Sequence, residues 1–173
     1  DVAVQDIFER FIPASQRAQR VGNVVNAAEL LSIKADSARG RIVFFETANL
    51  QCKNCHQVQD QGTAVGPELT HVGKKLTKDQ ILENIVEPSK TIESQYVTYT
   101  LQTTSGQVLT GLLASKTADE VVLKDAQGKL VRTAAADAEK LTPQRKSLMP
   151  DQLLRDLTPQ QAADLLEFLN SLK

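Results

Sequence analysis

The sequence predicts a mainly α protein with a small antiparallel β-sheet or barrel as an insertion, α+β overall. Apolar residues recur at helical spacing near both ends of the chain, and the stretch from Gln95 to about Leu141 is rich in Thr, Val and Tyr. The chain has 173 residues, 41% of them hydrophobic, which suffices for one core, alone or with a smaller satellite. We find no internal repeat and no low-complexity tract.

Two helices are predicted before residue 35. The apolar residues of the first share one helical face: Val4, Ile7, Phe8, Phe11 and Ile12. Pro13 ends that helix, because proline lacks the backbone N–H that a helix interior needs. The second is predicted over residues 15–31, although Gly22 weakens it. Its buried face would consist of Val21, Val24, Val25, Ala28 and Leu31.

A third helix is predicted to begin near Asp36, a good N-cap residue, and to run toward Cys52. It carries Gly40, Val43 and Phe44. Residues 62–73 then have the composition of a loop. A short fourth helix follows, since a capping box is formed by Thr77 with Gln80, and Pro88 ends the element. Its apolar residues are Ile81, Leu82, Ile85 and Val86.

The β-rich stretch predicts four or five short antiparallel strands. Turn signals lie at Ser105–Gly106 and at 125–128, and apolar Val97, Tyr99 and Leu101 alternate with polar residues. Its Ser, Thr and Asp residues have no histidine with which to form a nucleophilic triad. The chain then returns to a helix, with Thr158 as the cap, Pro159 at the first position and Gln161 completing a capping box. Its buried stripe is Ala162, Leu165, Leu166, Leu169 and Leu172.

The charge balance disfavours several classes of partner. Lys and Arg number 20 against 21 Asp and Glu, so the net charge of −1 provides no basic field for nucleic acid or an anionic membrane. No apolar run approaches the length of a membrane span. The N-terminus lacks the layout of a signal peptide and an initiator Met, so we expect a mature product or an excised domain whose targeting segment or anchor lies outside this stretch.

The two cysteines of the chain and one of its two histidines lie within five positions, in the stretch Cys52-Lys-Asn-Cys55-His56. The pattern C-x-x-C-H is the attachment signature of c-type haem. Cys52 and Cys55 would form thioethers with the two haem vinyl groups, and a helical turn would present His56 to the iron. The spacing therefore predicts one covalently bound haem c.

Other interpretations of this cluster remain open. A zinc site needs about four ligands, which Cys52, Cys55, His56 and His71 would only just supply. A thioredoxin-type redox pair uses C-x-x-C in a βαβ setting, whereas this pair follows a helix and precedes a Gly-rich loop. A structural disulfide would close too small a loop to stabilise the fold much.

The candidates for the second axial ligand are Met149 and His71, because the chain has no other Met or His. His71 follows His56 by only 15 residues, just beyond the Gly66-Pro67 loop. Met149 lies 93 residues beyond His56, and the β-rich stretch accounts for most of that separation. Pro150 biases Met149 toward an extended backbone. We favour Met149, with His71 as the alternative.

The order of these motifs resembles a class I cytochrome c. The motifs are Cys52-Lys-Asn-Cys-His56, Gly66-Pro67-Glu-Leu69, Ser147-Leu-Met-Pro150 and the C-terminal amphipathic helix. More closely, the chain resembles the haem-binding domain of planctomycete and verrucomicrobial proteins, in which a β-rich insertion precedes the axial methionine. Glu87-Pro88-Ser89-Lys90 and Tyr96 are also similar to that family, and the resemblance covers about residues 36–172.

This resemblance implies a domain layout and several contacts. The segments are 1–34, an N-terminal helical extension; 35–92, the haem-attachment half; 93–142, the β-rich insertion; and 143–173, the axial-Met loop and C-terminal helix. The first and last helices of the fold would cross, so that Gly40 and Phe44 meet Phe168 and Leu165. The carbonyl of Pro67 would accept a hydrogen bond from the ring of His56.

The function implied is electron transfer by a monohaem domain that is not itself an enzyme. In this family the domain usually belongs to a larger exported protein, so we expect a periplasmic or cell-surface location and redox proteins or neighbouring domains as partners. Lysines near the motif are balanced by acidic residues, which does not favour a basic docking ring. The alternatives are a haem-based gas sensor or peroxidase with a labile distal ligand, and, less favoured, a zinc-bearing interaction module.

Overall fold

A computed structural model describes residues 11, 13, 17–47, 50 and 52–173. The chain divides into two compact units. The helical unit comprises the chain up to residue 52 together with 71–86 and 152–173, and the sheet unit comprises 53–70 and 87–151. Four residues of the first predicted helix, Val4, Ile7, Phe8 and Ile12, lie outside the described residues, whereas Phe11 is described and is 70% exposed instead of buried.

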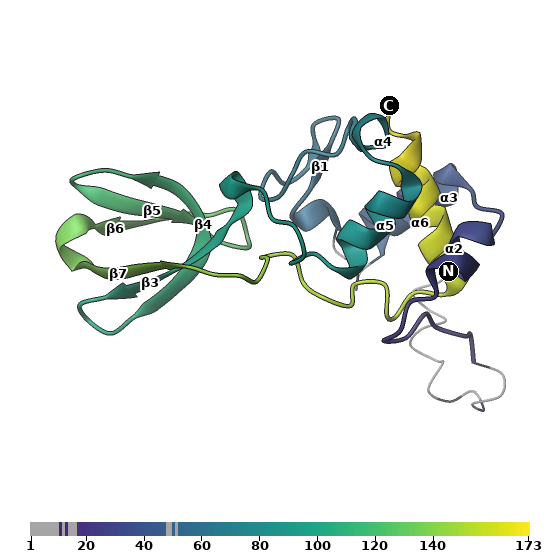
Figure 1. Ribbon diagram of the computed structural model, residues 1–173, viewed down its shortest axis with the longest axis horizontal. Coiled ribbons are helices and arrows are strands. Elements are labelled where there is room, and N and C mark those ends of the chain that lie inside the picture. Colours follow the sequence, from purple (N-terminus) through teal and green to yellow (C-terminus); the bar gives the residue numbers. More distant parts are fainter. Residues whose placement is uncertain (1–10, 12, 14–16, 48–49, 51) are drawn as a thin grey trace. The chain divides into compact units, whose positions relative to one another are not determined.

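The helical unit is built around its last helix (Figure 1). Helix α6 (Pro159–Ser171) contacts four other α-helices among the described residues of the unit. These are α2 (Ala27–Ser32), α3 (Ser37–Glu46), α4 (Val72–Lys75) and α5 (Lys78–Val86). The core comprises Leu30, Val43, Phe44, Ile81, Leu82, Ala162, Leu165, Leu166, Phe168 and Leu169.

Helices α3 and α6 cross at Gly40, as the resemblance predicts. A Cβ atom at position 40 would lie 1.9 Å from the carbonyl oxygen of Asp164 and 2.7 Å from Cβ of Phe168, so only glycine fits this close approach. The rings of Phe44 and Phe168 pack with their centroids 5.6 Å apart. These contacts join α3 to α6, the last helix of the unit.

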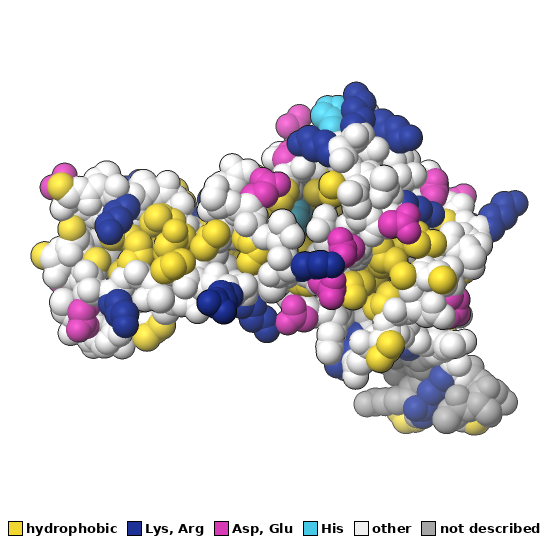
Figure 2. Space-filling model, viewed as in Figure 1, with side chains coloured by type: hydrophobic (Ala, Val, Ile, Leu, Met, Phe, Trp, Pro, Cys, Tyr) yellow, Lys and Arg dark blue, Asp and Glu magenta, His cyan; other side chains and the backbone are white. Residues whose placement is uncertain are grey.

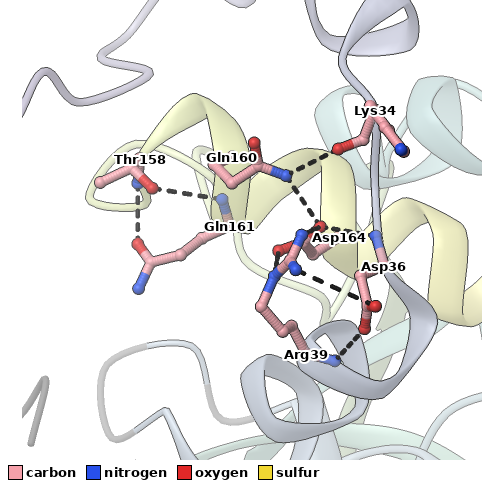
Figure 3. A network of polar contacts seen from close by, with 7 residues as sticks. All are labelled: Lys34, Asp36, Arg39, Thr158, Gln160, Gln161 and Asp164. Carbon is pink, nitrogen blue, oxygen red and sulfur yellow. Dashed lines mark hydrogen bonds and ion pairs between the residues drawn. The ribbon is translucent and has the colours of Figure 1, made fainter.

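A buried carboxylate reinforces the crossing (Figure 3). Asp164 is 2% exposed, and Oδ1 accepts hydrogen bonds from the backbone N–H of Asp36 at 2.7 Å, from Arg39 at 2.8 Å and from Gln160 at 2.9 Å. Oδ2 accepts from Nε of Arg39 at 2.7 Å. Burial alone would raise the pKa of Asp164, but these hydrogen bonds outweigh it and lower the pKa below its ordinary value.

Capping residues are confirmed where the sequence predicts them. Asp36 caps α3 through a bond from the backbone N–H of Arg39, and Thr158 forms the complete capping box with Gln161. The reciprocal hydrogen bonds of Thr77 and Gln80 are also present. Local side-chain chemistry therefore determines where these helices begin.

The helix predicted over residues 15–31 is wrong in extent. Helix α2 begins only at Ala27, where the side chain of Asn26 accepts from the backbone N–H of Glu29. Gly22 adopts φ +73°, which a right-handed helix does not contain, and Val24 is 86% exposed instead of buried. The N–H groups of Val21 and Gly22 instead bond carbonyls of the 155–157 segment.

The sheet unit contains a five-stranded antiparallel sheet in the order β6-β5-β4-β3-β7. Its strands are β3 (Thr98–Thr103), β4 (Val108–Lys116), β5 (Glu120–Lys124), β6 (Leu130–Ala134) and β7 (Ala138–Pro143). Strands β6 and β7 form its two edges, so the sheet is open and not a closed barrel. Register shifts at Gln102/Thr103 and Leu113/Ser115 introduce bulges.

One side of the sheet holds a small apolar core. Leu101, Val121 and Leu123 are buried, and further apolar residues pack against them: Tyr99, Leu109, Leu113, Ala138 and Leu141. Figure 2 shows hydrophobic side chains gathered in a band over the strands. The predicted alternation is imperfect, because Thr98 is 4% exposed and its hydroxyl has no hydrogen-bond partner among the described residues.

The prediction of a mainly α fold is wrong. Helices account for 33% of the structure and strands for 22%, in two sheets. The second sheet is the two-stranded hairpin β1 (Gln57–Val58) and β2 (Gln61–Gly62). The helical share falls short because residues 17–26 are not helical. In addition, residues 52–71 hold only one turn of 3₁₀ helix, η3 (Cys52–Asn54).

Candidate functional site

The C-x-x-C-H stretch begins in the 3₁₀ turn η3 and ends just before strand β1. Cys52 and Cys55 are both half-buried, and they are not joined in a disulfide. Burial raises the pKa of Cys55, the opposite of the lowered pKa that activates the nucleophile of a redox C-x-x-C pair. The setting is a short turn before a hairpin and not a βαβ unit, so nothing here favours a thioredoxin-type site.

The ring of His56 is held on one edge by Pro67. Nδ1 lies 2.8 Å from the carbonyl oxygen of Pro67. Because a carbonyl only accepts, the neutral ring carries its proton on Nδ1, which leaves the Nε2 lone pair for a metal. Burial lowers the pKa of His56, and the hydrogen bond to Pro67 offsets this only in part, so the ring is neutral near pH 7.

Gly66 makes room for this ring. A Cβ atom at position 66 would lie 2.8 Å from Cε1 of His56, a separation that side chains essentially never show, and 3.2 Å from Nδ1. Gly62 is required for another reason: it has φ +105°, and a Cβ atom there would lie 2.2 Å from the carbonyl oxygen of His56. Two glycines therefore let the chain fold tightly around the histidine.

Backbone hydrogen bonds hold the loop that supplies Pro67. The carbonyl of Cys55 accepts from the N–H groups of Val65 at 3.0 Å and Gly66 at 2.8 Å, and that of Lys53 accepts from Thr63 at 2.9 Å. We call residues 63–67 the proximal loop. Hydrogen bonds along most of this loop join it to the C-x-x-C-H stretch, so the position of His56 depends on the position of the loop.

The hairpin after His56 has an unusual turn. Gln59 and Asp60 have φ +47° and +62°, the left-handed region that two-residue hairpin turns require but that glutamine rarely adopts. The N–H of Gln59 donates to the hydroxyl of Thr70 at 2.7 Å, and Thr70 is in turn hydrogen-bonded to Glu68. The side chain of Thr70 thus stabilises the turn, although Gln59 and Asp60 intrinsically disfavour positive φ angles.

Met149 is half-buried on a loop between β7 and α6. Its N–H donates to the hydroxyl of Ser147 at 3.1 Å, and the N–H of Ser147 donates to the hydroxyl of Ser89 at 3.1 Å. This chain of bonds ties the methionine loop to the turn that contains Ser89, in which the N–H of Lys90 bonds the carbonyl of Glu87. Coordination of a metal by Met149 stays a prediction.

The remaining candidates occupy different settings. His71 is exposed, lies in the helical unit and precedes α4 without a side-chain capping bond. Tyr99 packs in the sheet core, as the sequence predicts. Tyr96 is half-buried in the turn η4 (Ser94–Tyr96), and burial together with the charge of Glu93 raises its pKa.

Sequence reasoning missed several residues that build this region. It gave Gly66 as a loop residue and as part of the Gly66-Pro67-Glu-Leu69 motif, but predicted no contact between Gly66 and the ring of His56, and it gave Ser89 no contact. The pair Gly66-Pro67 at the end of the proximal loop is a local signal for a tight turn. The Ser89–Ser147 bond joins residues 58 positions apart and has no local signal. Among the residues that the structure describes, no group of three or more His, Cys, Asp and Glu is placed to hold a metal ion, so the four-ligand zinc site has no support.

The donor set fits haem c. Two thiols stand at the spacing that haem attachment uses. The adjacent half-buried imidazole of His56 has Nε2 left for iron, because its Nδ1 is hydrogen-bonded to Pro67. Within the described residues, no helix combines the length and apolar character that crossing a bilayer requires.

Comparison with known proteins agrees with this fit. Residues 37–107 match the family model of cytochrome c, a range that contains α3, the C-x-x-C-H stretch, Pro67 and strand β3. No curated protein matches the chain. The family match supports a c-type cytochrome, implies haem c as its cofactor, and favours electron transfer to redox partners over catalysis.

Proposed function

We propose that the chain binds one haem c covalently through Cys52 and Cys55 and transfers electrons, with His56 and Met149 as the axial ligands. The observation that carries the proposal is the ring of His56, whose Nδ1 is bound to the Pro67 carbonyl and whose Nε2 remains for iron. When bound, haem c supplies a one-electron iron couple. The protein itself would carry out no further chemistry.

Attachment uses the two thiols. Each S–H would add across one vinyl double bond, the sulfur forming the thioether and the hydrogen going to the neighbouring carbon, without net oxidation or reduction. This requires both cysteines to be reduced, and a shared disulfide would block it. Because export-side maturation carries out this addition, we propose a periplasmic or cell-surface location.

The hydrogen bonds around the ligands support a six-coordinate electron-transfer site. The Pro67 carbonyl orients the His56 ring and increases its basicity. Ser147 and Ser89 restrain the backbone of Met149, which favours a fixed thioether over a labile ligand. Keeping both axial positions filled lets the iron change oxidation state with little rearrangement, which suits electron transfer.

We also propose that the chain is a module of a larger exported redox protein, close to the planctomycete and verrucomicrobial haem-binding domain. The five-stranded sheet between the C-x-x-C-H stretch and Met149 supports this closer relationship. Its partners would be redox proteins or neighbouring domains of the same chain. The segment 93–142 would be the insertion, and 35–92 with 143–173 would form the cytochrome domain around it.

Carbon monoxide binding tests the proposed ligation. We expect the reduced protein to show no rapid spectral change with carbon monoxide at neutral pH, because Met149 occupies the distal position. Met149→Ala should bind carbon monoxide, lose the near-infrared band of methionine ligation when oxidised, and retain covalent haem. His71→Ala is the matched control and should behave as the parent protein.

Two results would overturn this assignment. Rapid carbon monoxide binding by the parent protein would indicate a sensor or peroxidase site with a labile ligand. A spectrum unchanged in Met149→Ala but altered in His71→Ala would identify the histidine as the distal ligand instead.

A further inference from the structure

The turn between strands β5 and β6 lies against the proximal loop. Lys124, the last residue of β5, donates from Nζ to the carbonyl of Ala64 at 3.0 Å. At Gly128, a Cβ atom would lie 3.1 Å from Cγ2 of Thr63 and 3.4 Å from Cγ2 of Val65. The end of β5 and the turn that follows it therefore contact the loop in two places. Lys124 makes a hydrogen bond to Ala64, and the backbone of Gly128 lies close to the side chains of Thr63 and Val65.

The turn is internally well bonded and can act as a firm support. The N–H of Gly128 donates to the carbonyl of Asp125 at 3.0 Å, and the N–H of Asp125 donates to the carbonyl of Lys129 at 2.9 Å. The carboxylate of Asp125 also accepts from the N–H groups of Gln127 at 3.0 Å and Lys129 at 2.8 Å. Such aspartate-centred turns have few alternative conformations.

The proximal loop also contacts the C-x-x-C-H stretch and the histidine. Val65, which is 4% exposed, and Gly66 both donate to the carbonyl of Cys55, Gly66 abuts the ring of His56, and Pro67 accepts from its Nδ1. The loop thus connects the β5–β6 turn to the proposed axial ligand through direct contacts with both. A displacement of the loop changes the Pro67–His56 hydrogen bond directly.

We propose that the β5–β6 turn is a positioning element that holds the proximal loop and, through Pro67, sets the orientation and basicity of His56. This inference rests on the proposed haem ligation and gives the five-stranded sheet a role in it. A firm Pro67–His56 bond makes the imidazole a stronger donor and favours the oxidised iron. Loosening the turn should therefore raise the reduction potential.

Gly128 and Gly106 provide a matched pair for the test. Both are the fourth residue of a tight turn, with φ +79° and +82°, and each donates its N–H to the first residue of that turn. A Cβ at Gly106 meets nothing within 4 Å, whereas one at Gly128 meets the proximal loop. Gly128→Ala and Gly106→Ala therefore impose the same backbone strain but differ in contact with the loop.

The experiment compares the two variants in the haem-loaded protein. We expect Gly128→Ala to raise the reduction potential and to accelerate hydrogen exchange at the amides of Val65 and Gly66 several-fold relative to Gly106→Ala. Lys124→Met, which keeps the apolar stem and removes the bond to Ala64, should shift both readouts in the same direction by less. Lys116→Met, at an exposed position of the same sheet, is its control.

The outcomes separate this inference from the proposed function. If covalent haem is present and neither Gly128→Ala nor Lys124→Met differs from its control in potential or exchange, the positioning role is wrong while the ligation stands. If the parent protein carries no covalent haem, the proposed function is wrong, and the inference that rests on it is wrong as well. Should Gly128→Ala not fold, the Lys124→Met comparison decides the question alone.

Discussion

His56 is the residue around which the proposed site is organised. Three independent features constrain its ring: burial, the Pro67 hydrogen bond at 2.8 Å and the close approach of Gly66. The family resemblance predicts the Pro67 bond, because the Gly-Pro pair follows the motif at a similar place. It does not predict the clearance that Gly66 provides, since that depends on the path of the backbone and not on a side chain.

Ser89 offers a test of how the methionine loop is held. Ser89→Ala removes the acceptor for the Ser147 N–H, and losing a hydrogen bond of this kind costs about 1 kcal/mol. We expect haem attachment to be unchanged, but the near-infrared band of methionine ligation should disappear at a lower temperature than in the parent protein. Ser115→Ala, at an exposed position of β4, is the control. If the near-infrared band disappears at the same temperature in Ser89→Ala and Ser115→Ala, Ser89 does not hold the methionine loop.

At the scale of elements, the best predicted helices are those with strong local signals. Helices α5 and α6 begin at capping boxes that can be recognised within four residues. The segment before α2 has the apolar periodicity of a helix, yet Asn26 starts the helix late and Gly22 takes a left-handed conformation. Periodicity alone could not reveal this, because tertiary hydrogen bonds to the 155–157 segment stabilise the extended path.

The crossing of α3 and α6 predicts a severe effect of a very small substitution. Gly40→Ala places a methyl group 1.9 Å from the backbone of Asp164, so the two helices must separate. Overpacking of this kind costs about 1–3 kcal/mol, and backbone contact should bring the loss to the upper end. We expect Gly40→Ala to have a clearly lower free energy of unfolding than the parent protein when urea unfolding is monitored by circular dichroism.

The control for this substitution is Ala38→Ser, which adds one atom at an exposed position of the same helix. It should change the free energy of unfolding by less than about 0.5 kcal/mol. If Gly40→Ala proves as stable as Ala38→Ser, the close approach of the two helices is not required by the fold.

At the scale of the whole molecule, the stability should depend on pH through Asp164. Its pKa is lowered in the folded state, so the stabilisation is present above the unfolded value of about 3.9 and is lost as the pH falls through the folded pKa. Asp164→Asn keeps the shape and removes the charge. We expect it to lower the free energy of unfolding by about 1–3 kcal/mol at pH 7, with the difference shrinking in acid.

Asp156→Asn is the matched control for that variant. Asp156 also pairs with an arginine, Arg155, but its side chain is 67% exposed, so solvent screens the pair. Urea unfolding at several pH values should show no difference from the parent protein for Asp156→Asn. A constant deficit of Asp164→Asn across the acid range would mean that packing, and not the carboxylate charge, accounts for the loss.

The balance of helix and sheet was the least predictable property of the molecule. The β-rich composition predicts four or five strands, and five are present, but the extent of irregular chain between helices has no comparable signal. The long-range contacts that organise the proximal loop, such as Lys124 to Ala64, likewise depend on residues far apart in sequence. The chemistry of the C-x-x-C-H stretch is local, and the sequence therefore predicts it most directly.

Covalent attachment of haem through Cys52 and Cys55 is the central claim, and an alkaline pyridine haemochrome spectrum tests it most directly. The protein produced with export-side haem maturation should give the spectrum of a haem with both vinyl groups saturated, and acidified organic solvent should not extract the pigment. The Cys52→Ala and Cys55→Ala variants should each show one free vinyl group or lose haem altogether. A haem-free product, or a spectrum with both vinyl groups intact, would contradict the account.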